Sequence, residues 1–315
     1  MTRELKEQIV EAARAYMADR KITQTDLARQ SGVSKEYLSH MLNGKFAVSA
    51  GKNLVIISDA YFKRLADFIG FRLEKEYWTF RPTPQITALL AYLEDARRYG
   101  TTHLIVGETG SGKTYGVDIF LRKYPADVFK ITVGSTDNLA DLLDKIIDRL
   151  HIPSGKTKSK RLRDIAKKLR SLREQGGYPM LIFDEAEYMK QPALASMKEL
   201  YDALFRHAAI VLIGTDQLLS NIDRLRRKNK PGMPQFYRRI KFGIRRLRPV
   251  DRRFDMFLKD LPLDAGAKRF VRSICDNYGE LHDVLVPVLR ESERTGEPVT
   301  ENFIRKVLNL TEVYA

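Results

Sequence analysis

Short apolar runs alternate with amphipathic segments through the middle of this 315-residue chain. The apolar runs have the length of buried strands and lie at residues 103–106, 128–133, 178–183 and 208–213. Apolar residues recur at helical spacing around and between them, at residues 85–100, 115–124, 138–150, 159–174 and 192–207. Strands that alternate with helices are typical of a doubly wound parallel sheet, which binds its ligand at the carboxyl ends of its strands. The pattern therefore predicts an α/β core.

The N-terminal flank of this core has helical periodicity, and residues 2–20 predict a first helix. Residues 23–44 resemble the helix-turn-helix of the phage repressor and Cro type, with Gly32 at the turn between the two helices. Apolar residues at 46–71 are sufficient to close a small helical domain. We therefore expect an all-α domain over residues 1–71.

The second helix of this motif is predicted to begin after Ser34, whose hydroxyl suits a helix N-cap. It would present Lys35, Tyr37, Ser39 and His40 on its outer face, as a major-groove recognition helix does. The same motif is also simply a compact helix pair, and such modules sometimes bind protein. DNA contact by these side chains is the favoured interpretation.

The rest of the chain divides by composition. Charged residues and two prolines mark 72–84 as a linker. The α/β core extends over residues 85–249, and within it residues 221–235 are basic and loop-like while 241–244 predict a short strand. Residues 250–315 return to helical periodicity and predict a small C-terminal helical domain.

A glycine-rich motif follows the first strand of the core and precedes a helix. It fits the pattern Gly, four free residues, then Gly-Lys-Ser/Thr, and consists of Gly107, Glu108, Thr109, Gly110, Ser111, Gly112, Lys113 and Thr114. Backbone N–H groups of such a loop, reinforced by the positive end of the next helix, point at phosphate oxygens. Lys113 would reach the β- and γ-phosphates of ATP, and the Thr114 hydroxyl would ligate Mg²⁺.

Two acids complete the predicted site. The third apolar run ends in Asp184 and Glu185, which a parallel strand would deliver to the same crevice. Asp184 is placed to hold Mg²⁺, and Glu185 to orient and deprotonate the attacking water. The alternative makes both acids the start of a helix, where they also suit the dipole. Thr215 follows the fourth run, where it could contact the water or the γ-phosphate, or cap the next helix.

Composition narrows the functional class. No stretch approaches 18 uncharged apolar residues, so we expect no membrane span. The single cysteine, Cys275, rules out an intramolecular disulfide and favours a cytoplasmic protein. The net charge is +15, and residues 151–178 and 223–253 together carry more than that excess. Concentrated Lys and Arg exchange for counterions on a nucleic acid, so the charge indicates a polyanionic partner; a solvated basic face is the alternative.

In this order, the pieces resemble an AAA+ ATPase, and more narrowly the target-selecting ATPases of transposons typified by the phage Mu B protein and TnsC. The resemblance spans nearly the whole chain. It implies a P-loop core with a C-terminal helical lid, an N-terminal helix-turn-helix domain, and a homo-oligomer, either a helical filament or a ring. It also implies binding to double-stranded DNA and to a transposase.

The resemblance assigns further residues. Arg239, or else Arg238, would contact the γ-phosphate of ATP in a neighbouring subunit as an arginine finger. A basic loop and helix would contact DNA through Lys156, Lys158, Lys160, Arg161 and Arg163. One position departs from the family pattern, because His282 occupies the place of a lid arginine. Histidine is mostly neutral near pH 7, which favours slow hydrolysis with ATP as an assembly switch.

Two other functions fit the same parts. A transcription regulator would read an operator with the N-terminal domain and use the ATPase as a sensor. A helicase loader or replication initiator would share the ATPase architecture. The basic loop lies within the ATPase itself, whereas residues 1–80 carry thirteen Lys and Arg against ten acids. This distribution favours an ATPase that binds DNA with little sequence preference and activates a transposase.

Overall fold

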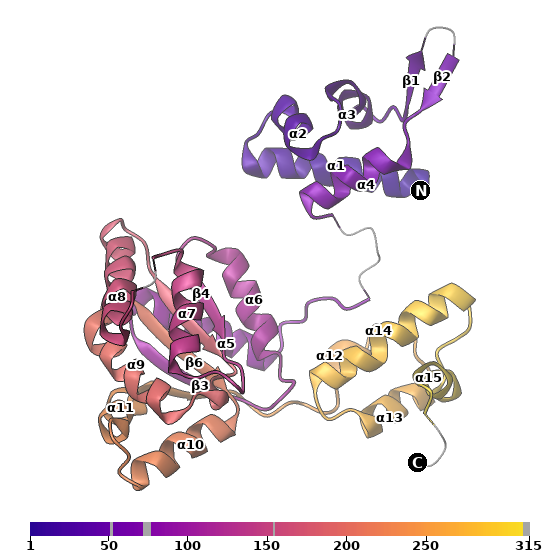
Figure 1. Cartoon of the computed structure of the whole chain (residues 1–315). Helices are drawn as coiled ribbons and strands as arrows, with labels where there is room; N and C mark the ends of the chain where they lie inside the picture. Colours follow the sequence, from indigo (N-terminus) through magenta and orange to yellow (C-terminus); the bar gives the residue numbers. More distant parts are fainter. Residues whose placement is uncertain (51–52, 72–76, 154, 311–315) are drawn as a thin grey trace. The chain divides into compact units, whose positions relative to one another are not determined.

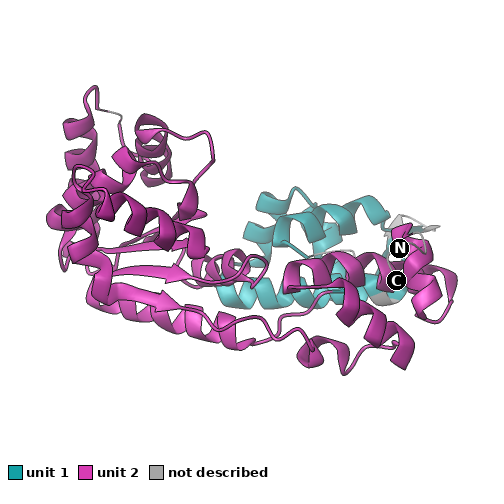
Figure 2. Ribbon diagram, turned by 90° about the horizontal axis from the view of Figure 1, so that it is seen from below, with its two compact units in different colours: residues 1–77 teal, residues 78–315 magenta. Residues whose placement is uncertain are grey.

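The chain forms two compact units, Met1–Tyr77 and Trp78–Ala315, which Figure 2 colours separately. The computed structural model describes residues 1–50, 53–71, 77–153 and 155–310. Within these ranges no helix is both long and apolar enough to cross a membrane. Each unit has its own hydrophobic core and is described separately below.

The first unit is a helical domain around a helix-turn-helix. Its helices are α1 (Arg3–Arg20), α2 (Gln24–Ser31), α3 (Lys35–Leu42) and α4 (Asp59–Ile69). Thr23 caps α2 in a reciprocal capping box with Asp26, and Gly32 takes a left-handed φ of 68° at the turn. The Ser34 hydroxyl accepts a hydrogen bond from the amide of Tyr37 and so starts α3. The predicted helix-turn-helix is confirmed.

An antiparallel hairpin interrupts this domain and corrects the all-α prediction. Its strands are β1 (Ala47–Ala50) and β2 (Asn53–Ile56), with Val48 opposite Val55. The helical interpretation of residues 46–71 overlooked that β-branched residues on both sides of Gly51 favour strands. Helix α4 then closes the core with Phe62 and Leu65, which are fully buried.

The second unit contains a five-stranded parallel sheet with the strand order β4-β5-β6-β3-β7 (Figure 1). The strands are β3 (Thr102–Val106), β4 (Val128–Thr132), β5 (Met180–Asp184), β6 (Ala209–Gly214) and β7 (Ile244–Arg246). Alternate residues face opposite layers. Ile105, Ile182 and Val211 belong to one core cluster, whereas Leu104, Leu181 and Leu212 belong to the other. The predicted doubly wound α/β fold is confirmed.

Helices cover both faces of this sheet. One core cluster includes apolar residues of α5 (Pro84–Tyr99) and α6 (Lys113–Lys123). The opposite cluster includes residues of α7 (Leu139–Leu150), α8 (Lys158–Glu174), α9 (Gln191–Leu204), α10 (Asp216–Arg227) and α11 (Met233–Ile240). This arrangement buries three of the strands, β3, β5 and β6, on both sides, which explains their continuous apolar sequence.

The loop predicted over residues 221–235 is wrong in part, because α10 continues to Arg227 and α11 begins at Met233. One face of α10 packs against the core through Leu218, Ile222 and Leu225. This apolar stripe is hard to recognise in the sequence because arginines are frequent between its residues. The strand expected at 241–244 is a short 3-10 helix, η2 (Lys241–Gly243), followed by β7.

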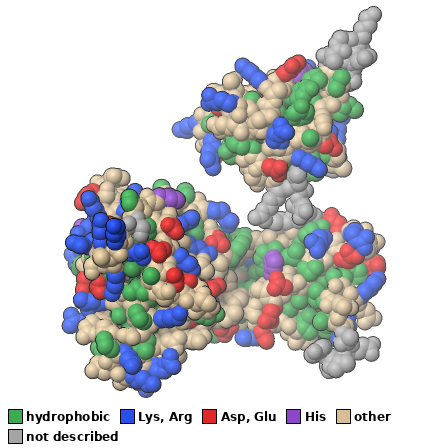
Figure 3. Space-filling view, viewed as in Figure 1, with side chains coloured by type: hydrophobic (Ala, Val, Ile, Leu, Met, Phe, Trp, Pro, Cys, Tyr) green, Lys and Arg blue, Asp and Glu red, His purple; other side chains and the backbone are tan. Residues whose placement is uncertain are grey.

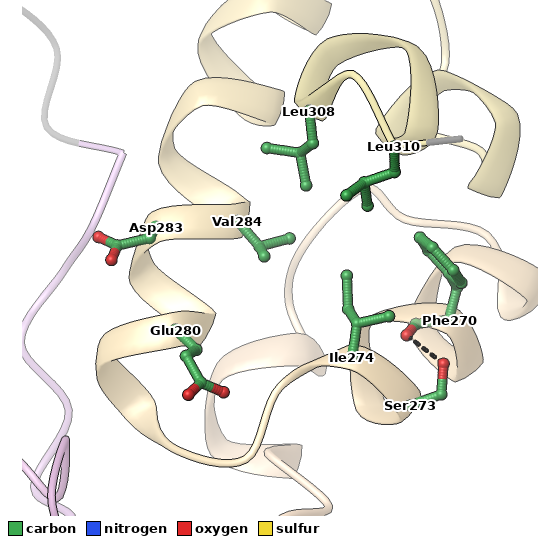
Figure 4. Close-up of a pocket in the computed structure, with 8 residues that line it drawn as sticks. All are labelled: Phe270, Ser273, Ile274, Glu280, Asp283, Val284, Leu308 and Leu310. Carbon is green, nitrogen blue, oxygen red and sulfur yellow. Dashed lines mark hydrogen bonds between the residues drawn. The ribbon is translucent and has the colours of Figure 1, made fainter. Parts of the chain in front are cut away.

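Residues 250–310 contain four helices, and we call this part of the second unit the lid. They are α12 (Asp255–Leu258), α13 (Ala265–Ile274), α14 (Tyr278–Thr295) and α15 (Glu301–Leu308). Trp78, from the predicted linker, stacks on Phe257 with ring centroids 4.7 Å apart. Figure 4 shows an apolar pocket of the lid, of about 630 Å³, into which Ile274 and Val284 project, with Glu280 and Asp283 at its rim.

Candidate nucleotide site and basic surfaces

The glycine-rich loop connects β3 to α6 at the carboxyl edge of the sheet. Gly110 and Gly112 have φ values of 67° and 87°, a left-handed conformation that favours glycine. A side chain at Gly107 would stand 3.0 Å from the side chain of Leu247. Helix α6 begins at Lys113, so its amino terminus faces the loop. This backbone is suited to hold phosphate oxygens.

The ammonium group of Lys113 is folded over its own loop. Its Nζ donates hydrogen bonds of 2.9 Å and 2.7 Å to the carbonyl oxygens of Gly107 and Glu108. Burial lowers the pKa of Lys113, while the carboxylates of Glu187 and Asp184 act in the opposite direction. A bound phosphate would supply the negative charge that best stabilises this buried cation.

Asp184 ends β5 and is buried, with 2% of its surface exposed. Its Oδ1 accepts a hydrogen bond of 3.1 Å from the amide of Glu185, and its Oδ2 lies 3.4 Å from Nζ of Lys130. Lys130 also pairs with Asp118 at 2.8 Å. These contacts hold the carboxylate in place at the crevice.

The residues fit a magnesium ion bound together with a nucleotide. The Thr114 hydroxyl and the Asp184 carboxylate are hard oxygen ligands, which Mg²⁺ prefers, and nucleotide phosphates and water usually complete its octahedron. Among the described residues no group of three His, Cys, Asp or Glu side chains could hold a metal alone. The donor set is therefore suited to a metal that arrives with phosphate.

The two glutamates that follow β5, Glu185 and Glu187, differ in how far their side chains are buried. Glu185 has a left-handed φ of 57°, and its side chain is exposed. Glu187, in the 3-10 helix η1 (Ala186–Tyr188), instead has a buried Oε2 and is the first of the acids that raise the pKa of Lys113. Sequence reasoning did not select Glu187, because no motif marks it; the only signal was its acidic type two residues beyond Glu185.

Thr215 lies at the end of β6, at the N-cap position of α10. Its side chain makes no capping hydrogen bond there, so the simple capping role is not observed. The adjacent Gly214 is closely approached by Glu187, since an added Cβ would stand 2.5 Å from Oε2 of that glutamate. The P-loop, Asp184 and Thr215 therefore share one edge of the sheet.

The lid contacts the P-loop directly. The carbonyl oxygen of Gly110 accepts hydrogen bonds from the amides of Tyr278 and Gly279, at 3.1 Å and 3.3 Å. These amides belong to the first turn of α14, which Asn277 caps. His282, one turn further along, pairs with Asp283 at 2.9 Å and meets the ring of Trp78 edge-on. It is part of the lid surface in this conformation.

The structure holds Arg239 away from the P-loop of its own subunit. Its guanidinium makes two hydrogen bonds to the Asp202 carboxylate, of 2.6 Å and 3.0 Å. Arg239 lines a cavity of about 730 Å³ together with Thr102, which begins β3, whereas the P-loop follows the end of that strand. Arg238 is exposed. An action of Arg239 on nucleotide would therefore require a second subunit.

The predicted basic loop surrounds the start of α8, where Thr157 caps the helix. Arg161 is tied to Asp144 at 3.0 Å and to the carbonyl of Gly155, and Lys158 lies 3.4 Å from Glu199. Three of the five predicted DNA contacts, Lys156, Lys160 and Arg163, are exposed and make no ion pair with a described carboxylate. Figure 3 shows Lys and Arg side chains gathered over α8 and over the end of α10.

Only part of the predicted outer face of the recognition helix α3 is exposed to solvent. Lys35 is exposed, whereas Ser39 and His40 are half-buried. Tyr37 packs edge-on against Tyr61, with ring centroids 4.8 Å apart. The aromatic ring of Tyr37 therefore supports the domain, and Lys35 is the most accessible of the predicted contacts.

Comparisons with known proteins agree with this architecture. Residues 97–222 match the family described as AAA domain, and residues 14–70 match the family described as Helix-turn-helix. The Mu-like prophage FluMu DNA transposition protein B of Haemophilus influenzae is 23% identical over 291 residues, which cover 91% of each chain. The chain is thus an AAA-type protein with an N-terminal helix-turn-helix domain. It is a distant homologue of Mu-like prophage transposition protein B.

Solved structures share the fold of the second unit. Cdc6p of Pyrobaculum aerophilum matches with a TM-score of 0.52 and 19% identity, covering 71% of this chain and 65% of that one. The Aeropyrum pernix ORC2 protein, solved as ADPNP–ADP complexes, matches with a TM-score of 0.52 and 18% identity, covering 74% and 68%. At this identity the likeness concerns the fold alone.

Proposed function

We propose that the protein is a Mg²⁺-dependent ATPase that assembles on double-stranded DNA and recruits or activates a transposase. One observation carries this proposal. A glycine-rich loop with Lys113 folded over it and a basic surface occur in one unit of a chain that is homologous to a transposition protein over most of its length. ATP would act mainly as an assembly switch. The subunits would assemble along the DNA.

The roles within the crevice follow from the side-chain chemistry. Lys113 neutralises the β- and γ-phosphates, while Thr114 and Asp184 hold the Mg²⁺ ion. Glu185 orients the attacking water once the neighbouring subunit and nucleotide close the site, and Thr215 contacts the γ-phosphate. His282 stands in the place of a lid arginine, and an imidazole lacks the fork of donors with which a guanidinium holds a phosphate, which favours slow turnover.

The DNA contact is assigned to the surface around α8. Lys156, Lys160 and Arg163 are exposed there, and phosphate contacts of this kind carry no direct sequence information. The helix-turn-helix domain adds contacts through Lys35 or tethers the assembly. Repetition of the α8 surface once per subunit would follow the DNA backbone in a filament or ring.

Electron micrographs of the full chain on plasmid DNA, with ATP or with ADP, test this proposal. Continuous filaments or rings with ATP, lost with ADP, are expected. Discrete oligomers at a few positions, with either nucleotide, would instead favour a regulator that reads an operator through its helix-turn-helix. Adding a purified transposase of a Mu-like element should raise the ATPase rate in the presence of DNA.

A further inference from the structure

Glu187 places a buried carboxylate oxygen against Gly214, at the sheet edge that carries the nucleotide crevice. Its Oε2 is shielded from solvent and accepts no hydrogen bond from the described residues. Gly214, at the end of β6, leaves the space that this oxygen occupies, because a Cβ there would stand 2.5 Å from it. The carboxylate thus lies at the sheet edge where the P-loop and Thr215 also lie.

The backbone fixes this position. Glu185 turns the chain through a left-handed conformation, so that η1 packs against β6 and α10. Ala186 is completely buried in that contact, and the carbonyl oxygen of Glu187 accepts a 3.5 Å hydrogen bond from the side chain of Asn221. These contacts hold the backbone of Glu187 in the position from which its Oε2 is buried.

Within the described part of the chain, no group donates a hydrogen bond to this oxygen. Lys113, whose charge interacts with that of Glu187, donates hydrogen bonds to the carbonyls of Gly107 and Glu108 instead. A buried carboxylate oxygen without a donor is costly, because the hydrogen bonds it made with water are not replaced. The other groups that act on Lys113 are acids as well: Asp184, Asp216 and Glu108. Each of these three acids has a cation of its own, namely Lys130, Arg246 and Arg252, whereas Glu187 makes no ion pair with a described cation.

We propose that Glu187 makes nucleotide binding depend on Mg²⁺. Its carboxylate repels the free triphosphate, and it accepts a hydrogen bond from the hydration water of a Mg²⁺ ion that accompanies the nucleotide. Mg²⁺ usually retains several waters in nucleotide sites, which are strong donors to carboxylates. This inference rests on the proposed ATP-binding function and assigns to Glu187 a positioning role distinct from that of Glu185.

Binding of a fluorescent ATP analogue to the full chain tests the proposal, with excess EDTA and with Mg²⁺. In the wild type, Mg²⁺ should tighten binding strongly. Glu187→Gln removes the negative charge but keeps the shape, so binding in EDTA should become tighter and the gain from Mg²⁺ should shrink by about tenfold. Glu187→Asp keeps the charge and should retain most of the gain.

Glu11→Gln, at an exposed position of α1, is the matched control and should behave as the wild type. An unchanged Mg²⁺ gain in Glu187→Gln would refute the inference. Equal weakening in EDTA and in Mg²⁺, together with a lower unfolding temperature, would mean that Glu187 only supports the fold. If the wild type binds no ATP analogue under either condition, the proposed function itself is wrong.

Discussion

The amide of Tyr278 donates a hydrogen bond of 3.1 Å to the carbonyl oxygen of Gly110. This bond ties the first turn of lid helix α14 to the centre of the P-loop. Among the three P-loop glycines, only Gly110 would overlap the lid if it carried a Cβ, since Oδ1 of Asn277 would lie 2.0 Å from that atom. The lid and the phosphate site are thus mechanically connected.

Gly110→Ala should therefore weaken ATP binding more than 10-fold, because it adds a steric overlap with Asn277 to the cost of a left-handed φ, itself about 1–2 kcal/mol for a non-glycine residue. Titration with a fluorescent ATP analogue measures the effect. Gly296→Ala is the matched control, since Gly296 has a φ of 73° but open space around it. The double variant Gly110→Ala/Asn277→Gly should recover part of the loss; if it recovers none, the overlap is unimportant.

Lys113→Ala and Glu185→Gln should separate nucleotide binding from hydrolysis. Lys113 stabilises the bound phosphates already in the ground state, so its removal should abolish nucleotide-dependent assembly. Glu185 acts only on the attacking water, so Glu185→Gln should bind ATP normally and prolong the assembled state. Filter-bound ATP and phosphate release are measured on both variants. Unchanged hydrolysis in Glu185→Gln would contradict the role assigned to this residue.

The sheet and the P-loop were predictable because local sequence determines them. Buried parallel strands require continuous apolar runs, and the loop requires Gly110 and Gly112 at left-handed positions. Asp184 was predictable for the same reason, since it directly ends a buried strand. Features of this kind depend on residues that are adjacent in the chain.

Features that depend on distant residues were not predictable. The inward position of Glu187 arises from the left-handed turn at Glu185 and from Gly214 on another strand. The pairing of Arg239 with Asp202 joins two helices across 37 residues of sequence. The hairpin of the first unit was missed because its two strands are only four residues long, and helical periodicity dominates around them.

Subunits that lack different parts of the site should complement each other. Arg239→Ala keeps its own P-loop, whereas Lys113→Ala keeps an intact arginine finger, so a mixture should hydrolyse more ATP than the two separate samples together. Steady-state turnover at constant total protein measures this. Arg238→Ala, at the exposed neighbouring arginine, is the control and should hydrolyse ATP by itself. Strictly additive rates would exclude action of Arg239 between subunits.

The buried His103 should make stability depend on pH. Burial, and then the charge of Arg245, lower the pKa of His103 below its ordinary value of 6.5, although Asp95 and the carbonyl of Tyr92 oppose this shift. The unfolded chain therefore takes up a proton more readily than the folded chain. The free energy of unfolding should decrease as the pH falls from about 6.5 through the lower pKa of the folded state.

Urea unfolding of the second unit, followed by the fluorescence of Trp78, the only tryptophan, measures this dependence. The urea midpoint should fall between pH 7.5 and pH 5, and the fall should be smaller in His103→Gln. His207→Gln, at an exposed histidine, is the matched control. The same fall in wild type and His103→Gln would assign the effect to other groups.

The salt dependence of DNA affinity should locate the DNA-binding surface. Lys156 and Lys160 are exposed beside the start of α8, and each contact with a phosphate adds about 0.9 to the slope of log affinity against log salt. Lys156→Ala/Lys160→Ala should therefore lower the slope by about 2 for each engaged subunit, by a similar amount on DNA of any sequence. The measurement uses a non-hydrolysable ATP analogue to hold the assembled state.

Lys35→Ala provides the decisive comparison, because Lys35 is the exposed cation of the recognition helix. If the surface around α8 binds the DNA, Lys35→Ala should leave most of the slope of log affinity against log salt unchanged. It should change only the affinity for particular sequences, because contacts with bases determine sequence preference whereas contacts with phosphates position the protein. If the double substitution leaves the slope intact and Lys35→Ala lowers it, the helix-turn-helix is the main DNA-binding surface. An operator-binding regulator would then be the better description, because its ATPase unit would not need to touch the DNA.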